Sequence, residues 1–306
     1  MKMDRGVAAG LGVVVLWASA FPAIQVAAPD LGVVGLSVVR LAVAAAGLLV
    51  AAVFTRVRLP RLPDLGWIIV AGFFGMTAYQ LLLNESELQV PAGTASMIVA
   101  AAPLVSVAVA RLLFRERITR ATMIGSAVAL SGVAIVCLSR AGVSVPAAVW
   151  IAVAAMVVQG IYHPLQRPLL RRYSGLEVAT YTMVAGTAMT LPLLPSGWSE
   201  LSGATAGGWL AAIYLGLLPS ALGFVLWGVA VGRLPVAVST SLLYLVPPVA
   251  VVIAWIWLGE VPLFTELTGG LVVLLGVVVI SQGQRLLDRL RASQRKETQA
   301  RVRLPR

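Results

Sequence analysis

The chain has 306 residues, of which 59% are hydrophobic and 11% charged, and its mean hydropathy is +0.95. A soluble domain carries about 25% charged residues, so this composition excludes one and predicts a polytopic protein of the lipid bilayer. The net charge of +11 lies mostly in short loops and a tail, where it sets membrane orientation, so no nucleic-acid partner is expected. With one cysteine and one histidine, neither a disulfide framework nor a metal or other cofactor is expected.

Ten apolar segments of membrane-spanning length follow one another along the chain. They are predicted at about residues 7–28, 33–54, 65–84, 92–113, 121–139, 147–166, 176–195, 208–230, 236–258 and 264–284. The start resembles a secretory signal, but its apolar run continues to Ala28, which favours a retained first helix. Breakers such as Pro29-Asp30 separate the segments, and the loops are too short for a soluble domain. The sequence therefore predicts an all-α membrane fold with ten transmembrane helices.

Residues 91–132 match residues 235–276 at a constant offset of 144. The matched pairs are Pro91 and Pro235, Pro103 and Pro247, Glu116 and Glu260, Gly125 and Gly269, and Gly132 and Gly276, with Gly72 and Gly216 upstream. Each half holds five predicted helices, and an odd number of crossings forces opposite orientations. We expect a first repeat at 1–140, a second, inverted repeat at 141–285, and a basic cytoplasmic tail at 286–306.

The basic residues orient this arrangement. If the N-terminus lies inside, 21 of the 23 Lys and Arg residues fall on the cytoplasmic side, and the exceptions are Arg40 and Arg140. The positive-inside rule therefore predicts that both termini lie in the cytoplasm. The tail from Arg285 onward is expected to lie on anionic headgroups.

Polar and aromatic residues within apolar helices are the candidates for function, because such residues are costly in lipid and usually face the bundle interior. The candidate substrate-binding residues are Trp17, Ser19, Tyr79, Gln80, Asn84, Ser96, Gln159, Tyr162, His163, Trp227, Ser241 and Tyr244. Packing between helices is the alternative for each of them. Motifs of catalytic sites are absent from the sequence, so we expect no enzyme.

Two prolines break apolar helices at related positions. Pro22 stands among Trp17, Ser19 and Gln25, and Pro164 follows Gln159, Tyr162 and His163. A proline frees a backbone carbonyl, so two facing kinks would form a central, gated site. His163 has an unperturbed pKa near neutrality and is either a proton carrier, a substrate donor or a packing residue.

Arg40 lies within the second predicted helix, roughly 10 Å below the outer surface. Glu85 and Glu87 end the third helix, so an ion pair of Arg40 with Glu85 is a candidate outer gate; snorkelling of Arg40 is the alternative. No Asp or Glu is predicted near mid-membrane, which favours neutral or zwitterionic solutes over cations.

Several stretches resemble the EamA-type ten-helix transporters of the drug/metabolite transporter superfamily. They include Leu16 to Pro22, the Arg40 region, Tyr79 to Asn84, Pro91 to Ser96 and Tyr244 to Pro248. The resemblance implies a multi-pass carrier of the bacterial inner membrane that exports amino acids or related metabolites by alternating access. It also implies a cavity lined by the first, third, fourth, sixth, eighth and ninth helices. The acids Glu85 and Glu87 depart from the family pattern at the end of the third helix.

Two other functions stay open on the sequence alone. Trp17, Tyr79, Tyr162, Trp227 and Tyr244 would also suit an exporter of aromatic or drug-like solutes. A non-transporting scaffold or receptor would need a soluble partner surface, and only the tail offers one. The sequence leaves open the substrate, its coupling and the oligomeric state.

Overall fold

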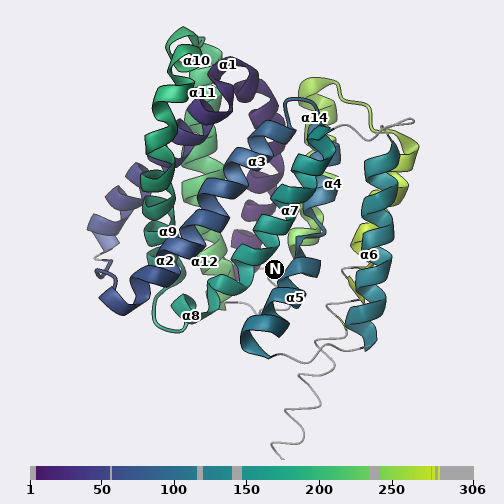
Figure 1. Ribbon diagram of the computed structural model, residues 1–306, viewed down its shortest axis with the longest axis horizontal. Helices are drawn as coiled ribbons and strands as arrows, with labels where there is room; N and C mark the ends of the chain where they lie inside the picture. Colours follow the sequence, from purple (N-terminus) through teal and green to yellow (C-terminus); the bar gives the residue numbers. More distant parts are fainter. Residues whose placement is uncertain are drawn as a thin grey trace, which may run out of the picture.

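The computed structural model describes residues 5–55, 57–115, 120–139, 147–233 and 242–276, together with 278, 279 and 282. These residues form a bundle of helices, with no strand among them, which confirms the all-α prediction (Figure 1). In chain order the helices are α1 (Arg5–Thr55), α2 (Leu65–Gly72), α3 (Tyr79–Ser86), α4 (Ala92–Val99), α5 (Ala102–Phe114), α6 (Arg120–Ser139), α7 (Ala147–Leu165), α8 (Arg167–Leu170), α9 (Gly175–Thr190), α10 (Trp198–Gly203), α11 (Ala206–Leu215), α12 (Gly223–Arg233) and α14 (Val246–Leu258). A further apolar helix spans Phe264–Gly276.

Several of these helices join into stretches long and apolar enough to cross a membrane. The stretches are Arg5–Thr55, Leu62–Ser86, Ala92–Phe114, Ala147–Leu170 and Ala206–Ala230. The first has 51 residues, or about 75 Å of helix, which is more than twice the roughly 30 Å of a bilayer core. The protein is therefore a multi-pass membrane protein, while the total of ten crossings stays a prediction.

The first long helix bends at a glycine. The sequence placed a break at Pro29-Asp30, but α1 stays helical there and departs from helical geometry at Gly32, with φ 68° and ψ 162°. A positive φ is costly for any residue with a Cβ, whereas proline's fixed φ is compatible with a helix. The break thus lies within the interval 29–32 that was expected between the first two helices, and the left-handed geometry explains why it falls at the glycine.

Irregular backbone features recur at the offset of the sequence repeat. A π-helical segment at Phe73–Ala78 precedes α3, and another at Gly216–Leu222 precedes α12. Helix α5 ends at Arg115 with φ 55°, and α14 ends at Gly259 with φ 70°. Arg115 is the described non-glycine residue with positive φ, and glycine occupies the matching position 144 residues later.

Close glycine contacts show the same pairing. A Cβ added at Gly132 would lie 2.8 Å from the carbonyl oxygen of Gly269, and one added at Gly276 would lie 2.6 Å from that of Gly125. These contacts join α6 to the Phe264–Gly276 helix, beside which α6 stands at one edge of the bundle (Figure 1). Small residues allow two helix backbones to approach closely in a membrane.

A second pair of glycine contacts joins the N-terminal part of the chain to the C-terminal part. A Cβ added at Gly72 would lie 2.9 Å from the carbonyl oxygen of Thr182, and one added at Gly216 would lie 2.9 Å from that of Arg40. The first contact joins α2 to α9, and the second joins the π segment before α12 to α1. Thr182 and Arg40 therefore hold equivalent places in the packing.

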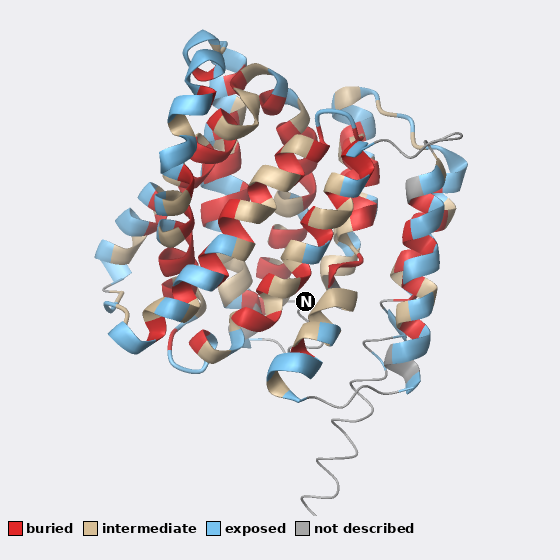
Figure 2. Ribbon diagram, in the orientation of Figure 1, coloured by how far each residue is buried: buried red, intermediate tan, exposed pale blue. Residues whose placement is uncertain are grey.

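The two stretches 5–139 and 147–276 pack into one another. Helix α1 contacts α11, α12 and α14, whereas α7 contacts α3, α4 and α5. Buried residues concentrate where these helices meet, and exposed residues lie on the outer faces and at the helix ends (Figure 2). Side chains from both stretches are therefore brought together inside the bundle.

Candidate functional site

The aromatic residues of the predicted site form a cluster between α1 and α12. Trp17 Nε1 donates to the carbonyl oxygen of Pro219 at 3.1 Å. Its ring centroid lies 5.5 Å from that of Phe224 and 5.7 Å from that of Trp227. The two predicted tryptophans thus lie together, and Trp17 already has a hydrogen-bond acceptor.

The two proline-containing helices face different neighbours. Near Pro22, Ser19 Oγ shares a 2.6 Å hydrogen bond with the hydroxyl of Tyr214 in α11. Near Pro164, His163 Nδ1 lies 3.4 Å from Ser106 Oγ in α5. The packing therefore does not support the hypothesis that Pro22 and Pro164 face each other across one site, because each helix lies mainly against its own set of partners.

A buried polar cluster lies between the second limb of α1 and α3, and we name it the Arg40 cluster. Its members are Ser37, Arg40, Tyr79, Gln80, Asn84 and Glu87. Asn84 Nδ2 donates to Ser37 Oγ at 2.9 Å, and Ser37 lies one helical turn before Arg40. Gln80 lies one turn before Asn84 on α3. Electrostatic interactions link Arg40 to Tyr79 and Glu87.

One hydrogen bond anchors Arg40 to the opposite half of the chain. Arg40 Nε donates to Ser220 Oγ at 3.0 Å, and Ser220 lies in the π-helical segment Gly216–Leu222. The exposed fraction of Arg40 is 6%, so the side chain does not reach the surface as the snorkelling alternative requires.

Several atoms of the Arg40 cluster are buried without a hydrogen-bond partner. They are Arg40 Nη1, Gln80 Oε1, Asn84 Oδ1 and both carboxylate oxygens of Glu87. A buried polar atom without a partner costs roughly 1–3 kcal/mol, and a charged one costs more. This is the largest group of such atoms in the part of the chain that the structure describes.

The expected ion pair of Arg40 with Glu85 is not formed in the described residues, and the acid that interacts with Arg40 is Glu87. Glu85 and Glu87 are two residues apart, or about 200° around a helix, so they point in nearly opposite directions. Glu87 is 3% exposed, whereas Glu85 is half-buried. The structure thus associates Arg40 with Glu87, while a gating role of Arg40 and Glu85 stays a prediction.

The predicted residues of α7 lie on two sides of that helix. Tyr162 is buried against Gly75, at the π-helical segment before α3, and its hydroxyl has no hydrogen bond of normal geometry. The amide oxygen of Gln159 is also buried without a partner. On the α5 side, Ser106 Oγ donates to the carbonyl oxygen of Gly160 at 2.9 Å, next to His163. The location of His163 at this helix contact favours its packing role over proton transfer.

Three predicted substrate-binding residues remain: one has a hydrogen bond within its own helix, one packs on the core, and one lies outside the described residues. Ser96 Oγ donates to the carbonyl oxygen of Gly93 at 2.6 Å, within its own helix. Tyr244 packs on the hydrophobic core. Ser241 lies outside the described residues.

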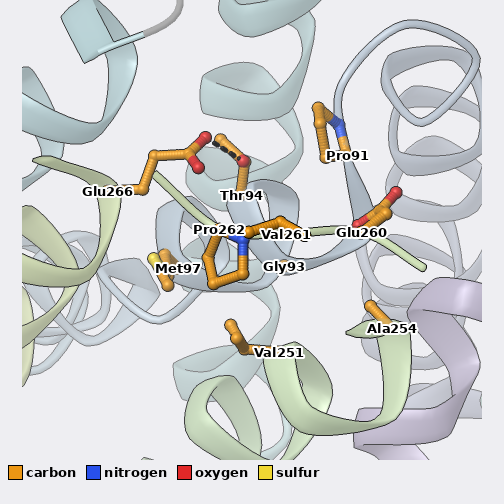
Figure 3. A pocket seen from close by; sticks show the side chains of 10 residues that line it. All are labelled: Pro91, Gly93, Thr94, Met97, Val251, Ala254, Glu260, Val261, Pro262 and Glu266. Carbon is orange, nitrogen blue, oxygen red and sulfur yellow. Dashed lines mark hydrogen bonds between the residues drawn. The ribbon is translucent and has the colours of Figure 1, made fainter. Parts of the chain in front are cut away.

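A small pocket lies where α4 meets the segment after α14 (Figure 3). Thr94 Oγ1 donates to Glu266 Oε1 at 2.5 Å, and the backbone nitrogen of Ala92 donates to Glu260 Oε1 at 3.3 Å. The volume of about 10 Å³ holds at most one water molecule. The pocket is thus a contact between the halves and not a site for a metabolite.

At the opposite end of the bundle, ionic contacts connect the segment before α2 to the segment before α9 and to the first turn of α9. Arg58 Nε lies 2.9 Å from Glu177 Oε1, and Arg172 Nη1 lies 2.5 Å from Asp64 Oδ1. The Tyr173 hydroxyl donates to Asp64 Oδ2 at 2.7 Å. The carboxylate of Glu177 raises the pKa of Arg58 above its ordinary value, chiefly through this hydrogen bond. This network could not be predicted from a local pattern, because its partners are more than 100 residues apart in the sequence.

Metal-binding groups do not gather in the described residues, where no cluster of three or more His, Cys, Asp or Glu side chains occurs. The buried polar atoms without hydrogen-bond partners lie instead in the Arg40 cluster and on α7, where a ligand could bind through hydrogen bonds.

Comparison with known proteins identifies related membrane transporters. A model of the EamA-like transporter family matches residues 4–138 and again residues 146–282. A protein of Streptantibioticus cattleyicolor named "Probable terminal-alkyne amino-acid exporter" is 50% identical, over 95% of this chain and 97% of its own. The uncharacterized transporter YdfC of Bacillus subtilis is 32% identical, over 86% of each chain. A crystal structure at 20% identity has a TM-score of 0.64 and covers 90% of this chain and 98% of its own, which shows a shared fold.

Proposed function

The chain belongs to the EamA-like transporter family, and we propose that it exports amino-acid-like small molecules by alternating access. The observation that carries this proposal is the 50% identity to a probable terminal-alkyne amino-acid exporter along nearly the whole of both chains. The unpartnered polar atoms of the Arg40 cluster add a physical reason, since buried polar groups in membrane helices mark substrate pathways.

The transport cycle that we propose rests on two oppositely oriented five-helix halves, at 1–140 and 141–285. The two family matches and the paired glycine contacts support this division. The distribution of Lys and Arg supports an orientation in which both termini are cytoplasmic, and we assign the protein to the inner membrane.

Each end of the bundle carries contacts between the halves that suit a gate. On the proposed cytoplasmic side, Arg58 pairs with Glu177 and Asp64 binds Arg172. On the proposed outer side, Thr94 donates to Glu266 and Asp30 accepts from Thr205 Oγ1 at 2.7 Å. Alternating access would break one set while the other holds, because a carrier exposes its site to one side at a time.

Counterflow in proteoliposomes tests this function. Purified protein is reconstituted, the vesicles are loaded with unlabelled propargylglycine, an amino acid with a terminal alkyne, and uptake of radiolabelled propargylglycine is measured. We expect accumulation above that of protein-free vesicles, and parallel assays with leucine and phenylalanine define how general the amino-acid specificity is. An imposed pH gradient in a second series shows whether protons are coupled to export. Absence of counterflow with every amino acid in the panel would reject the proposal.

The aromatic cluster favours a second candidate, an exporter of aromatic or drug-like solutes. Trp17, Phe224 and Trp227 form a contiguous aromatic group beside the bundle interior. These rings already pack on one another, so a flat solute would have to displace a side chain to stack there. Counterflow of tryptophan or of a planar dye, in the absence of propargylglycine counterflow, would favour this candidate.

A non-transporting scaffold or receptor is the alternative from another class. Its partner surface would have to lie in the tail at 286–306, so deleting that tail would abolish its activity. A transporter keeps its counterflow after the same deletion, and a complete loss in correctly inserted protein would favour the scaffold.

A further inference from the structure

The Arg40 cluster buries a basic and an acidic side chain, and each of them keeps polar atoms without a hydrogen-bond partner. Arg40 is 6% exposed and Glu87 is 3% exposed, yet Arg40 Nη1 and both oxygens of Glu87 have no hydrogen-bond partner. Removing an ion from water costs several kcal/mol unless a counter-charge or hydrogen bonds replace the lost solvent. The two side chains therefore retain binding capacity that a ligand could use.

The two charges are held near each other but not in contact. Each interacts electrostatically with the other, but no ion pair of 4.0 Å or less joins these two described residues. Ser220 Oγ holds Arg40 at Nε, which fixes the plane of the guanidinium while leaving Nη1 free. Glu87 follows the last turn of α3, so the end of that helix fixes its position.

Amide oxygens complete the set of acceptors on the Glu87 side. Gln80 is 3% exposed and Asn84 is fully buried, and the side-chain oxygen of each lacks a donor. The bond from Asn84 Nδ2 to Ser37 Oγ uses the amide nitrogen and leaves the oxygen available. The cluster thus presents carboxylate and amide oxygens as acceptors and a guanidinium as donor.

We infer that the Arg40 cluster binds the backbone of a zwitterionic amino acid, with Arg40 on the α-carboxylate and Glu87, Gln80 and Asn84 around the α-ammonium. This inference rests on the proposed export function and names its recognition chemistry. A guanidinium donates to a carboxylate in a fork, and an ammonium has three donors for the oxygens opposite. Because a guanidinium donor lies on one side of the cluster and oxygen acceptors lie on the other, a zwitterion fits the site better than a cation or an anion does.

Three ligands that share one side chain test this assignment on the full-length protein. Propargylglycine has both charged groups, but-3-ynylamine lacks the carboxylate, and pent-4-ynoic acid lacks the amine. Binding of each to purified wild-type protein is measured by calorimetry. We expect propargylglycine to bind roughly 30-fold more tightly than either analogue, since each analogue leaves one buried charge unpaired. Equal binding of either analogue and propargylglycine would overturn the inference without the need for a variant.

Substitutions then assign each charge to its ligand group. Arg40→Gln should abolish the preference for propargylglycine over but-3-ynylamine while keeping the preference over pent-4-ynoic acid, and Glu87→Gln should do the reverse. Arg171→Gln and Glu200→Gln, at exposed side chains, serve as matched controls that keep both preferences. Variants that keep the wild-type pattern of preferences would contradict the assignment.

A double variant separates recognition from folding. If a single substitution lowers the Tm because one buried charge is left alone, Arg40→Gln with Glu87→Gln should restore the Tm. We expect this neutral pair to bind propargylglycine no better than the analogues, and wild-type affinity in it would overturn the inference. The proposed function fails separately, if the wild-type protein shows no amino-acid counterflow while remaining folded.

Discussion

The Arg40 cluster and its counterpart in the second half occupy equivalent places in the packing but differ in chemistry. The carbonyl oxygens of Arg40 and Thr182 would each lie 2.9 Å from a Cβ added at the glycine that they face. Thr182 Oγ1 donates to the carbonyl oxygen of Val178 at 2.9 Å, so it is satisfied within its own helix. Phe224 and Gly228 stand where α3 has Gln80 and Asn84, and both are packed against neighbours, Trp17 and Gly175 respectively.

This difference teaches that two stretches matched by one family model can share helix crossings and differ in their buried polar groups. Glycines at helix crossings are retained in both halves, because a side chain there would collide with backbone atoms. The polar residues differ between the halves, since their positions admit either apolar packing or a buried charge. Function in this chain is thus expected to depend on positions where the two halves disagree.

The largest effect is expected from a comparison of one buried polar residue in each region. Asn84→Leu removes the amide from the Arg40 cluster with little change in size, and we expect propargylglycine counterflow to fall roughly tenfold. Thr182→Val, which removes a buried polar group from the second half, should leave counterflow within about twofold, since the hydroxyl donates to the carbonyl oxygens of Val178 and Ala179 in its own helix. Equal losses in both variants would break the comparison.

The retained glycines should behave alike in both halves. Gly132→Ala and Gly276→Ala each place a Cβ against the backbone of the facing helix, so each should lower the free energy of unfolding by about 1–3 kcal/mol. Gly66→Ala is the matched control, because nothing lies within 4 Å of its added Cβ. Thermal unfolding in detergent measures the three variants, and a large difference between Gly132→Ala and Gly276→Ala would show that the two crossings are not equivalent.

The smallest effect concerns the paired left-handed residues. Arg115 has φ 55° without the freedom of glycine, so Arg115→Gly should raise the free energy of unfolding by roughly 0.5 kcal/mol after the entropy of the unfolded chain is counted. Gly259→Ala, at φ 70°, should lower it by about 1 kcal/mol. Both are read as shifts of the denaturation midpoint, and stabilisation by Gly259→Ala would contradict the argument.

Much of the fold could be predicted because membrane burial leaves a strong sequence signal. Apolar runs located the helices, and Gly72, Gly132, Gly216 and Gly276 proved to lie at close helix contacts. The bend in α1 was expected between residues 28 and 33, where proline is the more visible breaker, whereas the turn needs the positive φ of Gly32. For the glycines within helices there was no choice between two residues, because each matches a glycine 144 residues away in the sequence.

The candidate site was predicted in its residues more than in its contacts. Arg40, Gln80 and Asn84 could be identified because polar groups are costly in lipid. The choice between Glu85 and Glu87 depends on how the chain leaves α3, and the ionic network of Arg58, Glu177 and Asp64 depends on loops far apart in sequence. No local pattern encodes such contacts.

The glycine crossing of α6 with the Phe264–Gly276 helix is self-complementary: Gly132 faces Gly269, and its repeat partner Gly276 faces Gly125. Two separate copies of one stretch that the family model matches would build the same crossing as an isologous homodimer. In such a dimer every substitution appears twice, so a lone arginine cannot be introduced on one side only. Joining the copies in one chain removes that constraint, and a charged cluster in a single half is an arrangement that only the joined form permits.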